Sequence, residues 1–112
     1  MYSIYMLYMT TQTFHRRIQN IKNQLQNLGL MRPGTLTRQY RDPKKKIGPF
    51  YQLSYTYRMK SRTEYVRPAF IPQIRKETAN FKRFKRLMQK WIDLALRLSK
   101  LQVDRAKKSL EK

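Results

Sequence analysis

The chain has 112 residues, and its 26 Lys and Arg outnumber its six Asp and Glu to give a formal charge of +20. The absence of cysteine excludes disulfides, Cys-based zinc sites and a thiol nucleophile, and it fits a reducing, cytoplasmic compartment. A compact chain with this charge repels itself unless a polyanion neutralises it, so the composition favours nucleic acid, RNA or DNA, as the partner.

Residues 1–10 form an apolar and aromatic N-terminal segment. It lacks the basic start and the small-residue cleavage site of a signal peptide, and no apolar run in the chain approaches the roughly 18–20 residues of a membrane span. We therefore expect neither secretion nor a membrane role. Two interpretations of residues 1–8 stay open: an extension from an upstream start, or a short strand that docks on a partner.

Residues 14–28 predict a helix of about four turns, because their apolar side chains recur with a 4-3-4-3 spacing along one stripe. The stripe consists of Phe14, Ile18, Ile21, Leu25 and Leu28. Thr11 or Thr13 can cap the start of this helix, and Gly29 can supply the left-handed residue at its end. The stripe is compatible with packing within the chain or with a homodimer, and we favour packing within the chain.

The middle of the chain predicts two or three antiparallel strands. Residues 35–40 are β-prone, and the alternation of residues 50–57 places Tyr51, Leu53, Tyr55 and Tyr57 on one face. Residues 58–60 predict a turn into a strand over residues 61–67, so these last two strands form a hairpin to which the first can add. Between the first two strands, residues 41–48 are expected to form a basic loop.

The C-terminal part predicts one long amphipathic helix that begins near Pro72, where the missing N–H is no loss. Its apolar stripe runs from Ile74 to Leu101, with basic residues on the opposite face. The apolar pattern fades after Gln102, so residues 103–112 are expected to be a frayed basic tail. The predicted fold class is α+β: an N-terminal helix, a two- to three-stranded antiparallel sheet and the long helix, in a single nucleic-acid-binding domain over residues 11–102.

Basic side chains gather in three groups: the loop between the first two strands, the hairpin turn with its flanks, and the outer face of the last helix. Lysines on a mobile loop reach phosphates without a fixed geometry, and counterion release supplies their affinity. A solvated charged loop is the plainer interpretation, but the overall charge favours phosphate contact. The predicted phosphate contacts are Arg38, Arg41, Lys44, Lys45 and Lys46, then Arg58, Lys60, Arg62 and Arg67, then Lys82, Arg83, Arg86 and Lys90.

The tyrosines of the predicted hairpin, which include Tyr65, have two interpretations. An exposed ring can stack on an unpaired base for roughly 1–3 kcal/mol, which makes Tyr51, Tyr55 and Tyr57 candidates for base stacking. The same rings can fill the space between the sheet and the long helix while their hydroxyls stay in water. We favour packing, and base stacking is the alternative.

Catalytic chemistry has little support in the sequence. His15 is the only histidine, and it lies beside Arg16 and Arg17 at the start of a predicted helix. The six acidic residues are scattered too widely in sequence to indicate a metal site, and a tyrosine nucleophile would need activating partners. We therefore expect no enzyme activity, no metal and no cofactor.

Three short motifs occur in order between Leu30 and Leu101: PGTLTRQY, GPFYQLSYTYRMKSRTEYV and NFKRFKRLMQKWIDLAL. In this order they resemble an uncharacterised family of small bacterial and archaeal proteins associated with transposases and other mobile elements. Its members carry a Cys-rich knuckle before the Gly-Pro strand, whereas RDPKKKI occupies that interval here, so no metal or redox role transfers. The resemblance implies the fold and a prokaryotic mobile-element context, without an established activity.

These observations lead to three hypotheses of function. The first is a non-enzymatic nucleic-acid-binding accessory subunit of a mobile-element complex, which holds the phosphate backbone. The second is a protein-interaction module that docks a larger nuclease, transposase or reverse transcriptase through its N-terminus and its amphipathic helices. The third is a ribosomal or ribosome-associated protein. No signature in the sequence distinguishes RNA from DNA.

Overall fold

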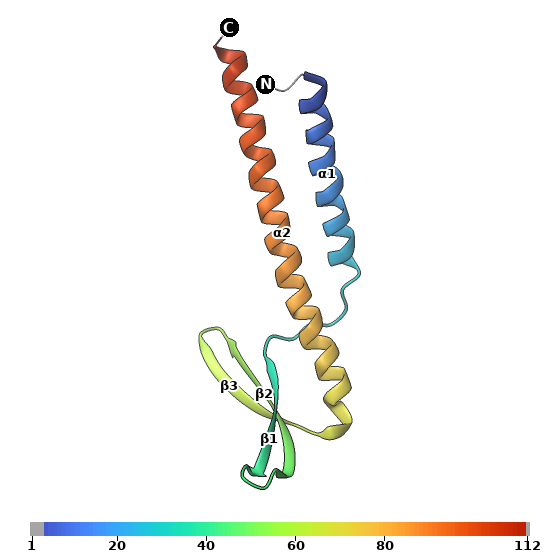
Figure 1. Ribbon diagram of the computed structural model, residues 1–112, viewed down its shortest axis with the longest axis vertical. Coiled ribbons are helices and arrows are strands. Elements are labelled where there is room, and N and C mark those ends of the chain that lie inside the picture. The colour runs from blue at the N-terminus through green and yellow to red at the C-terminus, as the bar shows by residue number, and fades with distance from the viewer. Residues whose placement is uncertain (1–3, 112) are drawn as a thin grey trace. The chain divides into compact units, whose positions relative to one another are not determined.

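The structure is a computed structural model that describes residues 4–111, and for residues 4–10 only the backbone. The chain forms a helix, a three-stranded sheet and a second helix (Figure 1). The elements are α1 (Ile4–Gln26), β1 (Thr35–Asp42), β2 (Ile47–Tyr57), β3 (Lys60–Val66), the short 3-10 helix η1 (Pro68–Phe70) and α2 (Ile71–Leu110). This order confirms the predicted α+β fold class, and the sheet has three strands.

The chain divides into two compact units. The helix unit comprises α1 and the second part of α2, from Lys85 onward. The sheet unit comprises residues 28–84, which include the linker after α1, the three strands and the first part of α2. The predicted single-domain boundaries, residues 11 and 102, stay a prediction.

In the helix unit, α1 runs antiparallel to the second part of α2 (Figure 1). Ile18 and Ile21 of α1 and Leu87 of α2 are buried. Full burial of an aliphatic side chain stabilises a fold by roughly 1.5–3 kcal/mol. The Lys22 ammonium lies 5.2 Å from the centre of the Trp91 ring, which adds a cation–π contact between the two helices. The predicted stripe of α1 therefore packs within the chain.

The first helix is longer than predicted. It begins at Ile4, so Thr11 and Thr13 lie inside it and their predicted capping role is wrong. A strand is likewise wrong for residues 4–8, which are helical, while residues 1–3 lie outside the described residues. The heptad spacing of the stripe reaches back through Thr11 to Ile4, and the polar Thr11 concealed this continuity.

Both helices also end differently from the prediction. α1 ends at Gln26, and Gly29 does not have the positive φ of a left-handed cap. α2 continues to Leu110, so the expected fraying of residues 103–112 is wrong for the helical part of this segment. Lys107 and Lys108 lie in the last turn of α2, where their positive charges interact favourably with the negative end of the helix dipole. This interaction supports the extension of the helix. Over the residues that the structure describes, neither helix has the length and apolarity needed to cross a membrane.

The sheet is antiparallel in the order β1-β2-β3, so β2 is central. Leu36 of β1 lies opposite Leu53 of β2, and Tyr51 of β2 lies opposite Val66 of β3. Leu53 is fully buried and forms the core of the sheet unit with Val66 and with Ile74 of α2. The first part of α2 therefore covers one face of the sheet, called the inner face below, and leaves the outer face open.

Candidate nucleic-acid interface

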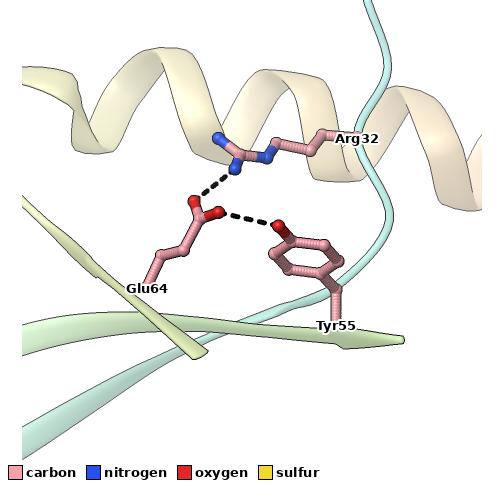
Figure 2. Close-up of polar contacts among 3 residues, drawn as sticks. All are labelled: Arg32, Tyr55 and Glu64. Atoms are coloured by element: carbon pink, nitrogen blue, oxygen red, sulfur yellow. Dashed lines mark hydrogen bonds and ion pairs between the residues drawn. The ribbon is translucent and has the colours of Figure 1, made fainter. Parts of the chain in front are cut away.

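A hydrogen-bonded cluster fixes the linker before β1 to the hairpin of β2 and β3. The Arg32 guanidinium and the Tyr55 hydroxyl both donate to the Glu64 carboxylate, the hydroxyl at 2.7 Å (Figure 2). The Tyr55 hydrogen bond is the main cause that holds the pKa of Glu64 below its usual value; burial opposes this effect and the charge of Arg32 adds to it. The cluster thus holds a charged carboxylate between three separate segments of the sheet unit.

Two more hydrogen bonds join the linker to α2. The backbone N–H of Arg32 donates to the Glu77 carbonyl at 3.1 Å, and the Asn80 side-chain amide donates to the Leu30 carbonyl at 2.9 Å. The backbone of Arg32 is therefore held by α2, and its guanidinium is held by Glu64. These contacts fix the position at which the linker enters β1. Sequence reasoning missed Arg32, because Glu64 lies 32 residues further along the chain.

The turn between β1 and β2 presents Lys44, Lys45 and Lys46, all of them exposed. The Asp42 carboxylate accepts a hydrogen bond from the backbone N–H of Lys45 at 3.3 Å, which orders the turn. Lys46 adopts a left-handed conformation with φ 54°, which lets the chain enter β2. The basic loop is therefore shorter than predicted, a turn over residues 43–46, because both strands extend into it.

The tip of the β2–β3 hairpin is exposed and strained. Its two central residues, Arg58 and Met59, have φ of 51° and 65°. Such two-residue turns favour Asn-Gly, and a left-handed conformation costs a residue with a side chain roughly 1–2 kcal/mol. Met59 is 99% exposed, and the Arg58 guanidinium lies 5.2 Å from the centre of the Tyr57 ring. The tip thus presents a cation and an apolar side chain at a cost in stability.

Every cation predicted to contact phosphate is exposed, but these cations are distributed over both compact units. Arg38, Arg41, Lys44, Lys45, Lys46, Arg58, Lys60, Arg62, Arg67, Lys82 and Arg83 belong to the sheet unit, and Arg86 and Lys90 to the helix unit. Six carboxylates can neutralise at most six of the 26 cations. Most of the positive charge therefore has no acidic residue of this chain to balance it.

The tyrosines considered for base stacking do not share one environment. Tyr51 and Tyr55 are half-buried on the inner face, against the core. The guanidinium groups of Arg75 and Arg32 lie 5.9 and 5.6 Å from the centres of these two rings. Packing, the favoured interpretation, therefore describes Tyr51 and Tyr55, and base stacking by these rings stays the alternative. Tyr57 is 56% exposed, and stacking by this ring stays a prediction.

The outer face of the sheet is polar and nearly uncharged. Alternation and register place these side chains on it: Thr35, Thr37, Gln39, Arg41, Phe50, Gln52, Ser54, Thr56, Ser61, Thr63 and Tyr65. The hydroxyls of Ser54 and Thr63 lie 3.4 Å apart, and the Thr37 hydroxyl donates to the Gln52 carbonyl at 3.5 Å. All of these side chains are exposed or half-buried, so the face is accessible to a ligand.

Sequence reasoning assigned a role to Arg41 but did not identify the outer face as a surface. The alternation of residues 50–57 already separated Gln52, Ser54 and Thr56 from the tyrosines. The register of β1 and β3 against β2 adds the hydroxyls and the amide on either side, and no local pattern reveals that register. The tyrosines of β2 drew attention to the inner face instead.

The helix unit carries a separate basic groove of about 370 Å³. Its floor includes Ile21 and Leu87, and its polar rim is formed by Arg17, Asn20, Gln24, Lys90, Asp93 and Arg97. Three cations against one acid make this groove attractive to anions. The sequence prediction included Lys90 but not its partner across the groove on α1, Arg17.

Among the residues that the structure describes, no group of three or more His, Asp or Glu side chains could hold a metal ion. Comparison with protein-family models, with curated proteins and with solved structures yields no match. The resemblance to the mobile-element family therefore stays a prediction, and function follows from the charges and surfaces of the chain itself.

Proposed function

We propose that the protein is a non-enzymatic accessory subunit that holds the phosphate backbone of nucleic acid in a mobile-element complex. The observation that carries this proposal is the excess of 26 cations over six acids, with clusters of cations exposed at both ends of the sheet. Lysine ammonium groups bind phosphate as point charges, and the release of condensed counterions supplies the free energy. The proposal needs no catalytic residue.

The length of β2 sets the scale of the contact. The turn with Lys44, Lys45 and Lys46, called the lysine turn below, precedes this strand and Arg58 follows it. The 11 residues of β2, at about 3.4 Å each, separate the two basic ends by roughly 35 Å. A duplex of this length carries roughly 20 phosphates, at one per about 1.7 Å, so about six to ten contacts are sterically reasonable.

The salt dependence of binding tests the proposal. With about six to ten phosphates neutralised, affinity for a 30-base-pair labelled duplex should fall about 10³- to 10⁵-fold between 50 and 200 mM salt. Fluorescence anisotropy measures this directly. A nearly flat response would contradict a phosphate-based mechanism.

A matched pair of triple variants locates the contact. We expect Lys44→Ala, Lys45→Ala and Lys46→Ala together to reduce the slope of log K against log salt by about 2–3, because each lost phosphate contact removes about 0.9. The control removes Lys100, Lys107 and Lys108, which are also exposed and carry the same charge. Equal loss of slope in both variants would show that charge in general, and not the turn, controls binding.

A second function, docking to a larger protein, is supported by an uncovered and largely apolar stripe on α2. The stripe repeats with a 4-3-4-3-4 spacing and consists of Ile92, Leu96, Ser99, Val103, Ala106 and Leu110, all exposed. This is the spacing of a coiled-coil seam, and it lies apart from the buried stripe that includes Leu87 and Leu98. Ile92 and Leu96 are each 54% exposed although they are large and apolar.

The charge beside this seam indicates its occupant. Lys100 and Lys107 follow Ser99 and Ala106 by one position, so they flank the seam where coiled coils place interhelical ion pairs. A second copy would bring another chain of charge +20, whereas a helix with acidic flanks complements these lysines. We propose that an amphipathic helix with acidic flanks, from a larger protein, occupies the seam.

A synthetic helical peptide with Leu at its seam positions and Glu at the flanks tests the docking surface. The double variant Leu96→Asn, Val103→Asn should weaken its binding at least tenfold, whereas Arg97→Asn, Asp104→Asn, which change neighbouring positions off the seam, should not. Equal binding of a peptide with Lys flanks would contradict the acidic occupant. Sedimentation of a dimer that the seam variant abolishes would identify a second copy as the occupant instead.

A further inference from the structure

We infer that the outer face of the sheet reads base edges in the major groove of duplex DNA. This inference rests on the proposed nucleic-acid binding and adds base recognition to it. Phosphate contacts position a protein on a duplex but carry no sequence information, whereas hydrogen bonds to base edges do. The sheet offers both kinds of group, and it separates them in space.

The distribution of charge over the strands is inverted relative to a sheet with one solvated face. Such a sheet normally places polar and charged residues outward and apolar residues inward. Here the inner-face positions hold Arg38, Asp42, Lys60, Arg62 and Glu64, and the outer face holds Arg41 alone. In a chain with 26 Lys and Arg, a strand face that is exposed only to water would be expected to carry several lysines. Neutral hydroxyls and amides on that face therefore indicate recognition by hydrogen bonds.

These side chains match the chemistry of the major groove. Glutamine pairs with adenine through two hydrogen bonds, Ser and Thr hydroxyls donate or accept, and the threonine methyl contacts the thymine methyl. Gln52 lies opposite Thr37, which makes Gln39 its diagonal neighbour on β1. Diagonal neighbours are about 7–8 Å apart, close to two base-pair steps of about 3.4 Å. The two glutamines can therefore address bases two positions apart.

The width of the sheet selects the groove. Neighbouring strands lie about 4.8 Å apart, so the outer two of the three strands are about 10 Å apart. The strand axes thus lie within the roughly 12 Å width of the B-DNA major groove, and they are too far apart for the roughly 6 Å of the minor groove. The major groove of A-form RNA is too deep and narrow for side chains to read. The strands then run along the groove, so the cations at the lysine turn and the hairpin tip meet phosphates at the two ends of the contact.

Selection from a random-sequence duplex library tests this inference. Wild-type protein should enrich a short motif, and the double variant Gln39→Met, Gln52→Met should lose its preference for that motif by about 5- to 150-fold per glutamine, which is the discrimination of one bidentate base contact. Its affinity for unrelated duplex should stay within about twofold, because the phosphate contacts are intact. Methionine keeps the length of the side chain, and a thermal melt verifies folding.

A matched control uses the same change of residue away from the sheet. Gln89 and Gln102 are exposed on α2, so Gln89→Met, Gln102→Met should leave the enriched motif unchanged. Tight, salt-dependent binding with no enriched motif would overturn base reading and leave the proposed phosphate binding in place. Preference for single-stranded RNA would overturn the duplex assignment. Absence of binding to any nucleic acid would overturn the proposed function as well.

Discussion

On the inner face of the sheet, Leu53 and Val66 are buried under α2, whereas the alternate residues of the same strands form an open layer of hydroxyls and amides with the rings of Phe50 and Tyr65. The inner face also contains the two tyrosines that most resembled a stacking platform, Tyr51 and Tyr55. Aromatic content alone therefore does not distinguish the covered face from the accessible one. The inner face stabilises the fold with rings and aliphatic groups. The outer face can contact a ligand without any change in the packing of the core.

The largest difference between the two faces should appear in stability. Leu53→Ala creates a cavity at a fully buried site and should cost about 2–5 kcal/mol in the free energy of unfolding. Ser54→Ala, on the neighbouring exposed residue, should cost less than about 1 kcal/mol because it loses one cross-strand contact. Urea denaturation measures both. Similar losses for the two variants would contradict the assignment of the faces.

The charged cluster on the inner side should have the next largest effect. Glu64→Gln weakens the acceptor that Arg32 and Tyr55 share, and we expect a loss of about 1–2 kcal/mol, since the group is partly exposed. Asp104→Asn removes the same charge from an exposed position and controls for added repulsion in a chain of charge +20. An equal loss in this control would mean that Glu64 acts only through net charge.

The pH dependence of stability isolates the tyrosine hydroxyl. The pKa of Glu64 is lowered in the folded state, chiefly by the Tyr55 hydrogen bond. The contribution of the Glu64 carboxylate to the free energy of unfolding is therefore present above the unfolded pKa and is lost as the pH falls through the folded pKa. Tyr55→Phe should therefore cost about 0.5–1.5 kcal/mol at neutral pH. The gap between wild type and variant should narrow in acid. A gap that is constant with pH would show that the hydroxyl does not act through the Glu64 carboxylate.

The smallest expected effect is a gain at the hairpin tip. Glycine adopts the left-handed conformation of Met59 without strain. Met59→Gly should therefore stabilise the fold by about 0.5–1 kcal/mol, a net gain from which the greater entropy of glycine in the unfolded chain has been subtracted. Met59→Ala removes the apolar side chain but keeps the strain, so it should give no gain. If both variants bind duplex DNA more weakly than wild type, the exposed methionine contributes to binding. Destabilisation by glycine would contradict strain at the tip.

Periodicity and alternation were sufficient to predict the elements and their order. The heptad stripe predicted α1, and the alternation around Leu53 predicted which residues of β2 face the core. The ends of the two helices were less predictable. In α1, the polar Thr11 interrupts a stripe that continues to Ile4. In α2, Ser99 and Ala106 occupy positions of the uncovered seam, so the apolar pattern predicted too early an end for the helix.

The candidate site was only partly predictable for a different physical reason. Cations are recognisable one at a time, so the lysine turn and the hairpin arginine could be named from the sequence. The outer face depends on how β1 and β3 align with β2, and the Arg32–Glu64 contact joins residues 32 positions apart. Both are set by tertiary packing, for which a single sequence carries no local signal.

An NMR titration of isotope-labelled protein with a 20-base-pair duplex reports on both faces of the sheet at once, and it therefore tests whether the outer face binds DNA. We expect shifts and broadening at the backbone amides of Thr37, Gln52 and Thr63 on the outer face and of Lys45 in the turn. The amides of the buried Leu53 and Val66 should change far less. Shifts confined to the groove of the helix unit, with the outer face of the sheet unaffected, would contradict this expectation.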